Sequence, residues 1–376
     1  MLPSLLIDTL RLGSSSGDDL AARWRAVDIR GLLEIVAYEG AAIWLYRRLR
    51  AVGALDGLPS GISDRLRQMA IEAAGSRLEV EAEAAAAVTV LQRAAVPVIL
   101  IKGVARCALA ERYPYLDARA TLDVDLLVPY ELSAAAESGL IADGYVPACE
   151  ARPPEAPRHH HLLPLHKGRI TVELHDSTSV RVPAHIAWSR ANEGSELVRW
   201  AGQTVRIPSV TEVAWSAVAH AMEDAVDGFR LARFLEFAAL AGNDAPIDWA
   251  VLAGRRNSPE VFDPEAGVTD PALVINNWLG ATLALVAEEH RPAGLDVPRF
   301  NLAELIAWRL DVLRARQTLG RPLTERLLTE GVRTAVGLPL ELAPSMASRW
   351  AKMRRPVAGT ASRAAFRMWR ATRRYR

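Results

Sequence analysis

The residues best suited to chemistry are three acidic side chains in two short, largely apolar segments. Asp123 and Asp125 lie two positions apart within Leu122–Val128, and Glu173 lies within Ile170–His175. Both segments alternate polar and apolar residues, as strands with one buried face do, so a pleat would bring Asp123 and Asp125 to the same face. Adjacent carboxylates repel unless a cation lies between them, and hard oxygen ligands suit Mg²⁺ or Mn²⁺. The three acids therefore predict a divalent-metal site.

A candidate phosphate-binding turn lies upstream of these acids. Val98–Ile101 is short and β-branched, as buried strands often are, and it stops at Lys102 and Gly103. The next residues favour a helix from Val104 to about Tyr113. A strand, a glycine turn and a helix N-terminus leave unpaired backbone N–H groups aimed at one point, which favours a phosphate. A phosphate site opposite three carboxylates fits phosphoryl or nucleotidyl transfer.

Four further polar residues are candidates for supporting roles. Arg119 could pair with a carboxylate or contact a phosphate. His175 shares the predicted strand face of the acid two residues before it, so it could orient that carboxylate or bind a substrate phosphate. His220 and Asp224 fall on one polar stripe of a predicted helix, which is either a solvated face or part of an acceptor-binding wall. The histidines at 159–161 fit no common zinc spacing, which favours hairpin or supporting roles.

These motifs occur in an order that resembles a known superfamily. Lys-Gly, Tyr113, Arg119, Asp-Val-Asp before Leu-Leu-Val, and Val-Glu-Leu-His together resemble the polymerase-β-like nucleotidyltransferases, nearest to a poorly characterised bacterial branch with Lys-Gly in place of Gly-Ser. The resemblance implies that Asp123 and Asp125 bind metals and that Glu173 completes the site or acts as base. It assigns the Lys102-Gly103 turn to the triphosphate, and we add Arg119 to the nucleotide-binding residues.

The resemblance also implies an activity. We expect a two-metal enzyme that moves an NMP group from an NTP to an acceptor hydroxyl or phosphate on a small molecule, a sugar or an RNA end. Two alternatives stay open. One is a phosphotransferase on the same fold, and the other is a degenerate nucleotidyltransferase that serves as a binding or scaffold protein.

The elements around these motifs predict an α+β fold. A small mixed sheet over 96–208 would form the nucleotidyltransferase core, between a helical N-terminal lobe over 1–95 and a helical C-terminal lobe over 209–340. A long helix should run from Ser63 to about residue 95, and a hairpin turning at Lys167-Gly168 should carry the third acid into the sheet. A capping-box pattern from Ser209 to Glu212 should start a helix that lasts through residue 240, with a break near Gly228.

Composition limits the remaining possibilities. The 376 residues are 50% hydrophobic with a formal net charge of +1, but residues 341–376 contain ten Lys/Arg and one acid. This basic tail, with interleaved aromatics, could contact RNA or an anionic surface, or it could be a solvated tail. Two cysteines are too few for a disulfide framework. With no basic leader and no apolar run of about 20 residues, the expected location is the cytoplasm.

Overall fold

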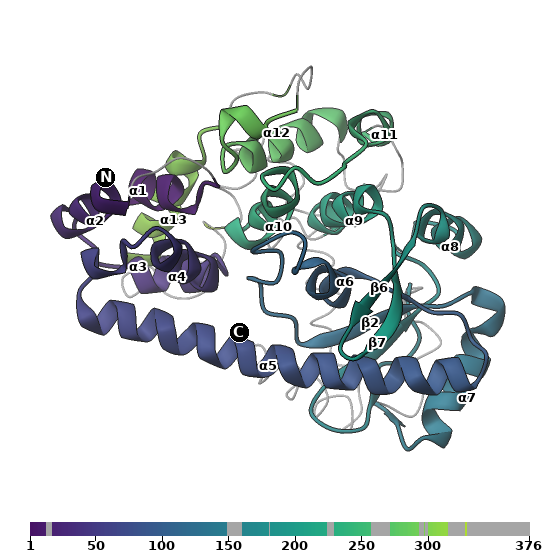
Figure 1. Cartoon of the computed structure of the whole chain (residues 1–376). Coiled ribbons are helices and arrows are strands. Elements are labelled where there is room, and N and C mark those ends of the chain that lie inside the picture. Colours follow the sequence, from purple (N-terminus) through teal and green to yellow (C-terminus); the bar gives the residue numbers. More distant parts are fainter. Residues whose placement is uncertain are drawn as a thin grey trace, which may run out of the picture.

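The computed structural model describes residues 1–12, 17–148, 160–179, 181–223, 229–256, 271–292, 297, 300–314 and 328. Its architecture confirms the predicted α+β class, because helices surround a five-stranded mixed sheet and a separate two-stranded sheet (Figure 1). The predicted basic tail lies outside the described residues. Within the described ranges, no helix combines the length and apolar character needed to cross a membrane.

The five-stranded sheet has the order β1-β2-β5-β4-β3, and only its central pair, β2 and β5, is parallel. The hairpin predicted around Lys167-Gly168 is formed by β4 and β5. The second sheet is the antiparallel hairpin β6-β7. The strands are β1 (Ile99–Leu100), β2 (Asp123–Leu127), β3 (Val146–Pro147), β4 (Leu165–His166), β5 (Thr171–His175), β6 (Glu196–Trp200) and β7 (Gln203–Ile207).

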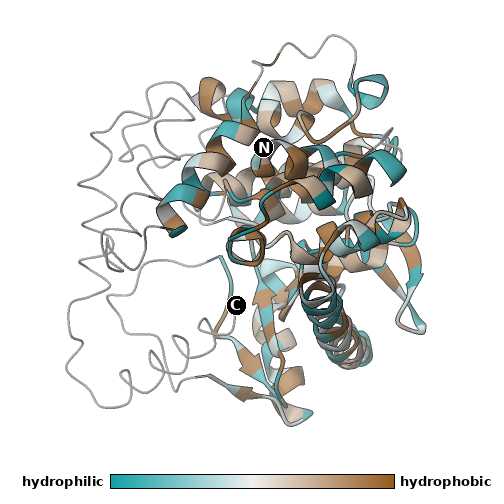
Figure 2. Cartoon of the chain, turned by 90° about the vertical axis from the view of Figure 1, so that its left-hand side faces the viewer, coloured by the Kyte–Doolittle hydropathy of each residue, from teal (hydrophilic) through white to brown (hydrophobic). Residues whose placement is uncertain are grey.

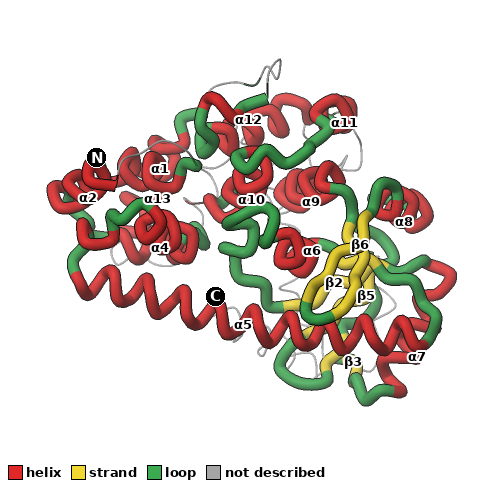
Figure 3. Tube along the Cα trace, in the orientation of Figure 1, coloured by secondary structure: helices red, strands yellow, loops and turns green. Residues whose placement is uncertain are grey.

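Some helices cover this sheet, and others pack together beside it as a helical bundle (Figure 3). The helices before the sheet are α1 (Leu2–Leu10), α2 (Gly17–Ala26), α3 (Leu32–Tyr38), α4 (Ala42–Ala51) and α5 (Ser60–Arg93). Those within the predicted core are α6 (Lys102–Leu109), α7 (Ser133–Ala142) and α8 (Ala184–Asn192). Those that follow are α9 (Val210–Glu223), α10 (Leu231–Ala241), α11 (Trp249–Arg255), α12 (Pro271–Leu283) and α13 (Leu302–Arg314).

The predicted long helix is α5, and it runs from the bundle of N-terminal helices to the sheet (Figure 1). It begins at Ser60 instead of Ser63, because Pro59 occupies the N-cap position and the hydroxyl of Ser63 donates inside the first turn, to the carbonyl of Ser60. Figure 2, in which α5 points toward the viewer, shows both hydrophilic and hydrophobic residues along it. Its buried residues concentrate toward its C-terminal half, which packs on the sheet.

The two faces of the central strands have different chemistry. Val124, Leu126, Val172 and Leu174 are fully buried in the main core, where α5 and α7 pack against β2 and β5. The opposite face carries the acidic residues of both strands. At one end this face turns apolar and carries a small buried cluster. The cluster contains Ile99, Ile101, Leu127 and Ala191.

Helix α6 corrects the expected turn after β1. It begins at Lys102, two residues before the predicted start, and ends at Leu109 instead of near Tyr113. Lys102 has φ +50°, a left-handed value that residues other than glycine rarely adopt, so the reversal is made at the lysine. Gly103 is needed for close packing instead, since a Cβ there would overlap the Thr121 side chain.

The predicted cap at Ser209 is confirmed, because the backbone N–H of Glu212 donates to Ser209 Oγ at 3.2 Å. The carboxylate of Glu212 accepts from Arg255 at 2.6 Å, so it ties α9 to α11. Helix α9 is described up to Glu223, and α10 starts at Leu231 after the non-helical residues Phe229 and Arg230. Gly228, where we expected the break, lies outside the described residues.

The helical segments before and after the sheet pack on each other. Helices α1 and α3 contact α13, and Leu12 forms an isolated bridge with Val286. One continuous hydrophobic core includes residues from both segments and from the main face of the sheet. The boundaries at 95 and 208 therefore divide the chain by sequence, while the core crosses them.

Candidate metal and nucleotide site

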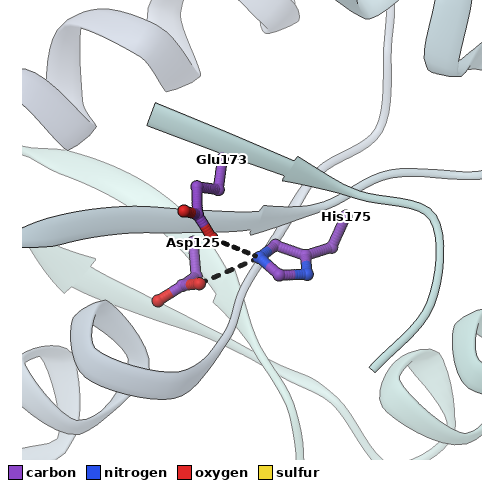
Figure 4. A group of neighbouring side chains, drawn as sticks. All are labelled: Asp125, Glu173 and His175. Carbon is purple, nitrogen blue, oxygen red and sulfur yellow. Dashed lines mark hydrogen bonds and ion pairs between the residues drawn. The ribbon is translucent and has the colours of Figure 1, made fainter. Parts of the chain in front are cut away.

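The acids meet because β2 and β5 are parallel and in register. Asp125 lies opposite Glu173, and Asp123 lies opposite Thr171. Directly opposed residues in a sheet project to the same side, so the pairing places the two carboxylates side by side. Figure 4 shows both pointing to one place, together with the ring of His175 from the end of β5.

Asp125, Glu173 and His175 form the tightest group. Their ligand atoms lie within 4.8 Å of one another. His175 Nε2 is 2.9 Å from Asp125 Oδ1 and 3.6 Å from Glu173 Oε2, and the imidazole is fully buried. Asp123 is partly buried on the same strand face and is not a member of this group. The third member of the group is therefore His175, which lies opposite Leu127 in the strand register.

Lys102 reaches into this acidic group. Its ammonium donates to Asp125 Oδ1 at 2.9 Å and lies 3.4 Å from His175 Nε2. The lysine, predicted to bind phosphate, therefore forms an ion pair with a carboxylate of the site. Its left-handed φ turns the side chain back over the strands, so the strained backbone and the ion pair belong to one arrangement.

The charges of the group are mutually stabilised. Burial raises the pKa of Asp125, but the Lys102 ammonium and the hydrogen bond with His175 outweigh it and hold the pKa well below its usual range. Burial likewise raises the pKa of Glu173, while the hydrogen bond with His175 brings it below its ordinary value. Burial lowers the pKa of Lys102, but Asp125 raises it further. Both acids are therefore ionised, and the lysine charged, at neutral pH.

Two more histidines pack around His175. The His160 ring stacks on it with centroids 5.2 Å apart, and the His161 ring lies 5.4 Å away. Burial lowers the pKa of His160 to about 2, so this ring is neutral. The sequence favoured supporting roles for these histidines, and the structure places two of them as neighbours of the site. His159 lies outside the described residues.

The remaining predicted site residues are Arg119, His220 and Asp224. Arg119 forms an ion pair with Glu236 of α10. His220 of α9 is close enough for Lys102 and Arg119 to affect it, and burial foremost holds its pKa well below the ordinary value. Asp224 lies outside the described residues.

Sequence reasoning missed three charged residues beside Arg119. Arg106, Arg233 and Glu236 gather around it, with Glu236 contacted by all three arginines. Arg233 and Glu236 stand three residues apart in the otherwise apolar segment LARFLEFAALA. Charged residues inside an apolar helix are seldom buried without partners. The presence of these two charged residues in an apolar helix was therefore the sign in the sequence that they have partners elsewhere in the fold.

The donor set fits a divalent cation. Two ionised carboxylates and an imidazole, buried or nearly so, offer oxygen and nitrogen ligands within 4.8 Å. Carboxylates suit Mg²⁺ and Mn²⁺, while an imidazole ligand is more usual for later transition metals. The buried Nδ1 of His175 has no hydrogen-bond partner in the described part of the chain. The other ring nitrogen, Nε2, is the one that faces the acids.

The site combines a small mixed sheet, ionised carboxylates on parallel strands and a neighbouring group of arginines around Glu236. A family model described as uncharacterised nucleotidyltransferase matches residues 25–269, well over half of the chain, and the protein belongs to that family. No curated protein and no solved structure matches the chain. The match covers all the strands and site residues described above.

Proposed function

We propose that the protein transfers an NMP group from an NTP to an acceptor hydroxyl or phosphate. The observation that carries the proposal is the in-register pairing of Asp125 with Glu173 on parallel strands, within the part of the chain that matches a nucleotidyltransferase family. Asp123, Asp125 and Glu173 would hold Mg²⁺ or Mn²⁺. The bound cations would supply charge neutralisation at the phosphates and would acidify the acceptor hydroxyl.

In this reaction the acceptor oxygen forms a bond to the α-phosphorus of the NTP. The bond from that phosphorus to the α,β-bridging oxygen breaks, and its electron pair leaves with pyrophosphate. Glu173 is ionised at neutral pH and lies beside Asp125, so its carboxylate could receive the acceptor proton or would help to hold a cation. Lys102, Gly103 and Arg119 are the proposed nucleotide-binding residues. We assign His175 to orienting the two carboxylates and His220 to a supporting or acceptor-binding role.

The proposal is tested with labelled nucleotides. The purified chain is incubated with Mg²⁺ or Mn²⁺ and a cell extract, in parallel with each NTP labelled at the α- or the γ-phosphate. Nucleotidyl transfer moves the α-label to an acceptor and releases pyrophosphate. Transfer of the γ-label alone would show a phosphotransferase, the alternative on the same fold.

The binding-protein alternative has its own test. The double variant Asp123→Ala/Asp125→Ala is compared with the wild type for metal-dependent NTP binding. A matched control is Asp143→Ala, which removes a carboxylate that pairs with Arg93 and Lys167 away from the site. If the double variant binds and labels like the wild type, the catalytic assignment is wrong.

A further inference from the structure

The outer side of α5 carries an exposed apolar stripe, on a helix that runs along one border of the molecule (Figure 1). In the first half of this helix, Leu66 is buried and the other residues are partly or fully exposed. Ile71 and Leu78 are 59% and 60% exposed, and they lie seven residues apart, about two turns, on one side of the helix. Gly75 and Ala82 are exposed on the same side. We call these last four residues the α5 stripe.

The glycine in the α5 stripe is a second observation. Gly75 lies inside a helix of 34 residues, where glycine destabilises the helix relative to alanine. A Cβ at this position would meet no atom of the described chain within 4 Å, so packing within those residues does not require a glycine. A glycine on an exposed helix face does allow a second helix to approach closely. Packing against a helix of another molecule would therefore account for Gly75.

The α5 stripe is complementary to itself. Two antiparallel copies of α5, related by a two-fold axis beside Gly75, would place Ile71 of each copy against Leu78 of the other. The two apolar contacts are identical by symmetry, and the two glycines meet where the helices are closest. This match depends on the spacing of the large residues on either side of the glycine. It favours a second copy of the chain over a partner of unrelated sequence.

The charges on one flank of the α5 stripe favour the same pairing. The axis that joins residues 71 and 78 also brings Arg67 of one copy beside Glu81 of the other, and symmetry repeats the contact. The side chain of Arg67 is 52% exposed, and its Nη1 is 3.4 Å from Asp64. Glu81 is 21% exposed and lies 3.3 Å from Arg77. Opposite charges that flank an apolar seam select the partner and the orientation of paired helices.

The surroundings of Glu81 suit a further cation. Burial foremost raises the pKa of this carboxyl, the charge of Arg77 lowers it, and the nearby Asp117 carboxylate raises it again. An arginine from a second copy would offset the neighbouring negative charge. On the other flank, Glu72 and Glu79 already pair with arginines of their own chain, at 3.9 and 3.5 Å. The pairing therefore needs no additional cation there.

We propose that two copies of the chain associate through α5, antiparallel about a two-fold axis beside Gly75, with Ile71 of each copy packed on Leu78 of the other. Beyond Ala82, the helix borders an open pocket of about 470 Å³, next to the turn between β6 and β7, which leaves room for the N-terminal part of the partner's helix. Helix α5 packs on the face of β2 and β5 opposite the acids, so the pairing does not involve the acidic face.

The first test measures the mass of the full chain by sedimentation velocity at about 1–100 µM, a range that covers micromolar dissociation constants. The wild type should approach twice the mass of one chain as its concentration rises. Leu78→Glu should weaken association about tenfold or more, because it places a charge in the apolar contact. The matched control is Leu197→Glu on β6, where the leucine is 62% exposed outside α5, and it should associate as the wild type does. Circular dichroism checks that each variant is folded.

A charge exchange tests the axis itself. Arg67→Glu and Glu81→Lys each place like charges beside each other in both contacts, so each variant alone should associate more weakly than the wild type. An equimolar mixture of the two variants should associate again, because a mixed dimer restores an opposite-charge pair at both contacts. A mixture that stays as weakly associated as the separate variants would contradict the antiparallel arrangement.

A cysteine at the axis gives an independent measurement. In a Cys149→Ser background, Gly75→Cys should form disulfide-linked dimers with oxidised glutathione, because the axis brings the two copies of residue 75 together. The control is Gly61→Cys, another α5 position with open space around it but 14 residues from the axis, which should not cross-link. The mass of a single chain at every concentration would overturn the proposal and leave the α5 stripe to a different partner. A dimer indifferent to Leu78→Glu would overturn it as well, since the copies would then pair elsewhere. Neither assay contains nucleotide, so both outcomes are independent of NMP transfer.

Discussion

Glu39 and Asp125 are both buried carboxylates, yet their surroundings differ. Glu39 accepts two hydrogen bonds from Arg309 Nη1, at 2.8 and 2.9 Å, and one from the Leu231 N–H at 2.8 Å. Arg309 Nη2 donates to the Phe229 carbonyl, and both charged side chains are fully buried. One cation matches one anion, so this pair joins α3, α10 and α13 and leaves no charge for a ligand.

Asp125 differs because a second carboxylate faces it. It forms an ion pair with the Lys102 ammonium, and Glu173 lies opposite it on the neighbouring strand. Adjacent carboxylates repel unless a cation lies between them, so this group is suited to bind a divalent cation and the Glu39–Arg309 pair is not.

The largest expected difference between these regions is in activity. Asp125→Asn should reduce NMP transfer about a thousandfold, because several kcal/mol of charge stabilisation at the phosphates depends on the bound cations. Glu39→Gln should leave the rate of NMP transfer per folded molecule within about twofold of the wild-type rate. Glu39 belongs to the ion pair with Arg309, which we call the closed pair, and this pair lies outside the site. Rates are measured with α-labelled NTP and corrected for the folded fraction. A thousandfold loss of NMP transfer in Glu39→Gln would contradict the distinction between these two buried carboxylates.

The next largest effect concerns stability at the closed pair. Arg309→Met leaves the Glu39 carboxylate buried without its cation and should lower the free energy of unfolding by about 3–5 kcal/mol. The double variant Glu39→Gln/Arg309→Met removes both charges and should recover part of the loss. Urea unfolding measures each value. Additive losses in the double variant would contradict the assignment of these residues as a coupled pair.

A smaller effect is expected for metal affinity at the acidic group. Lys102→Met removes the ammonium that neutralises Asp125 and should tighten Mn²⁺ binding about tenfold in the absence of nucleotide, because a competing charge beside the carboxylate is lost. Mn²⁺ binding is followed by electron paramagnetic resonance. Unchanged or weaker binding would show that Lys102 does not compete with the cation. Lys167→Met, on the hairpin turn, is the control.

The strands that carry the acids were predictable from sequence, because the alternation of polar and apolar residues within each strand is a local pattern. Polar and apolar residues alternate on both strands, and the hairpin turn at Lys167-Gly168 fixes how Glu173 returns to the sheet. The sequence also indicated the α+β class, the long helix and the cap at Ser209. What it could not supply was the parallel register of β2 and β5, which pairs Asp125 with Glu173 and draws in His175.

The Glu39–Arg309 pair and the Arg119–Glu236 pair each join residues that are far apart in the sequence. Glu39 and Arg309 are 270 residues apart, and Arg119 and Glu236 are 117 apart, so neither pairing has a local pattern. The conformation of Lys102 was missed for another reason. Its left-handed φ is usually taken by glycine, so the sequence did not indicate that the lysine of the expected Lys102-Gly103 turn adopts it.

The smallest expected effect belongs to Asp117, which combines features of both regions. It pairs with Arg47 of α4 at 2.6 Å and with Arg77 of α5, and it lies two residues before Arg119. Burial raises its pKa, but the hydrogen bond with Arg47 and the charges of both arginines bring the pKa below the ordinary value. A lowered folded-state pKa stabilises the fold above the unfolded-state value of about 3.9, and this contribution is lost as the pH falls below it. Asp117→Asn should therefore be less stable than the wild type at pH 7 and should lose stability less steeply below pH 4, as measured by urea unfolding at each pH. Parallel curves for the two proteins would show that this ion pair adds nothing to stability.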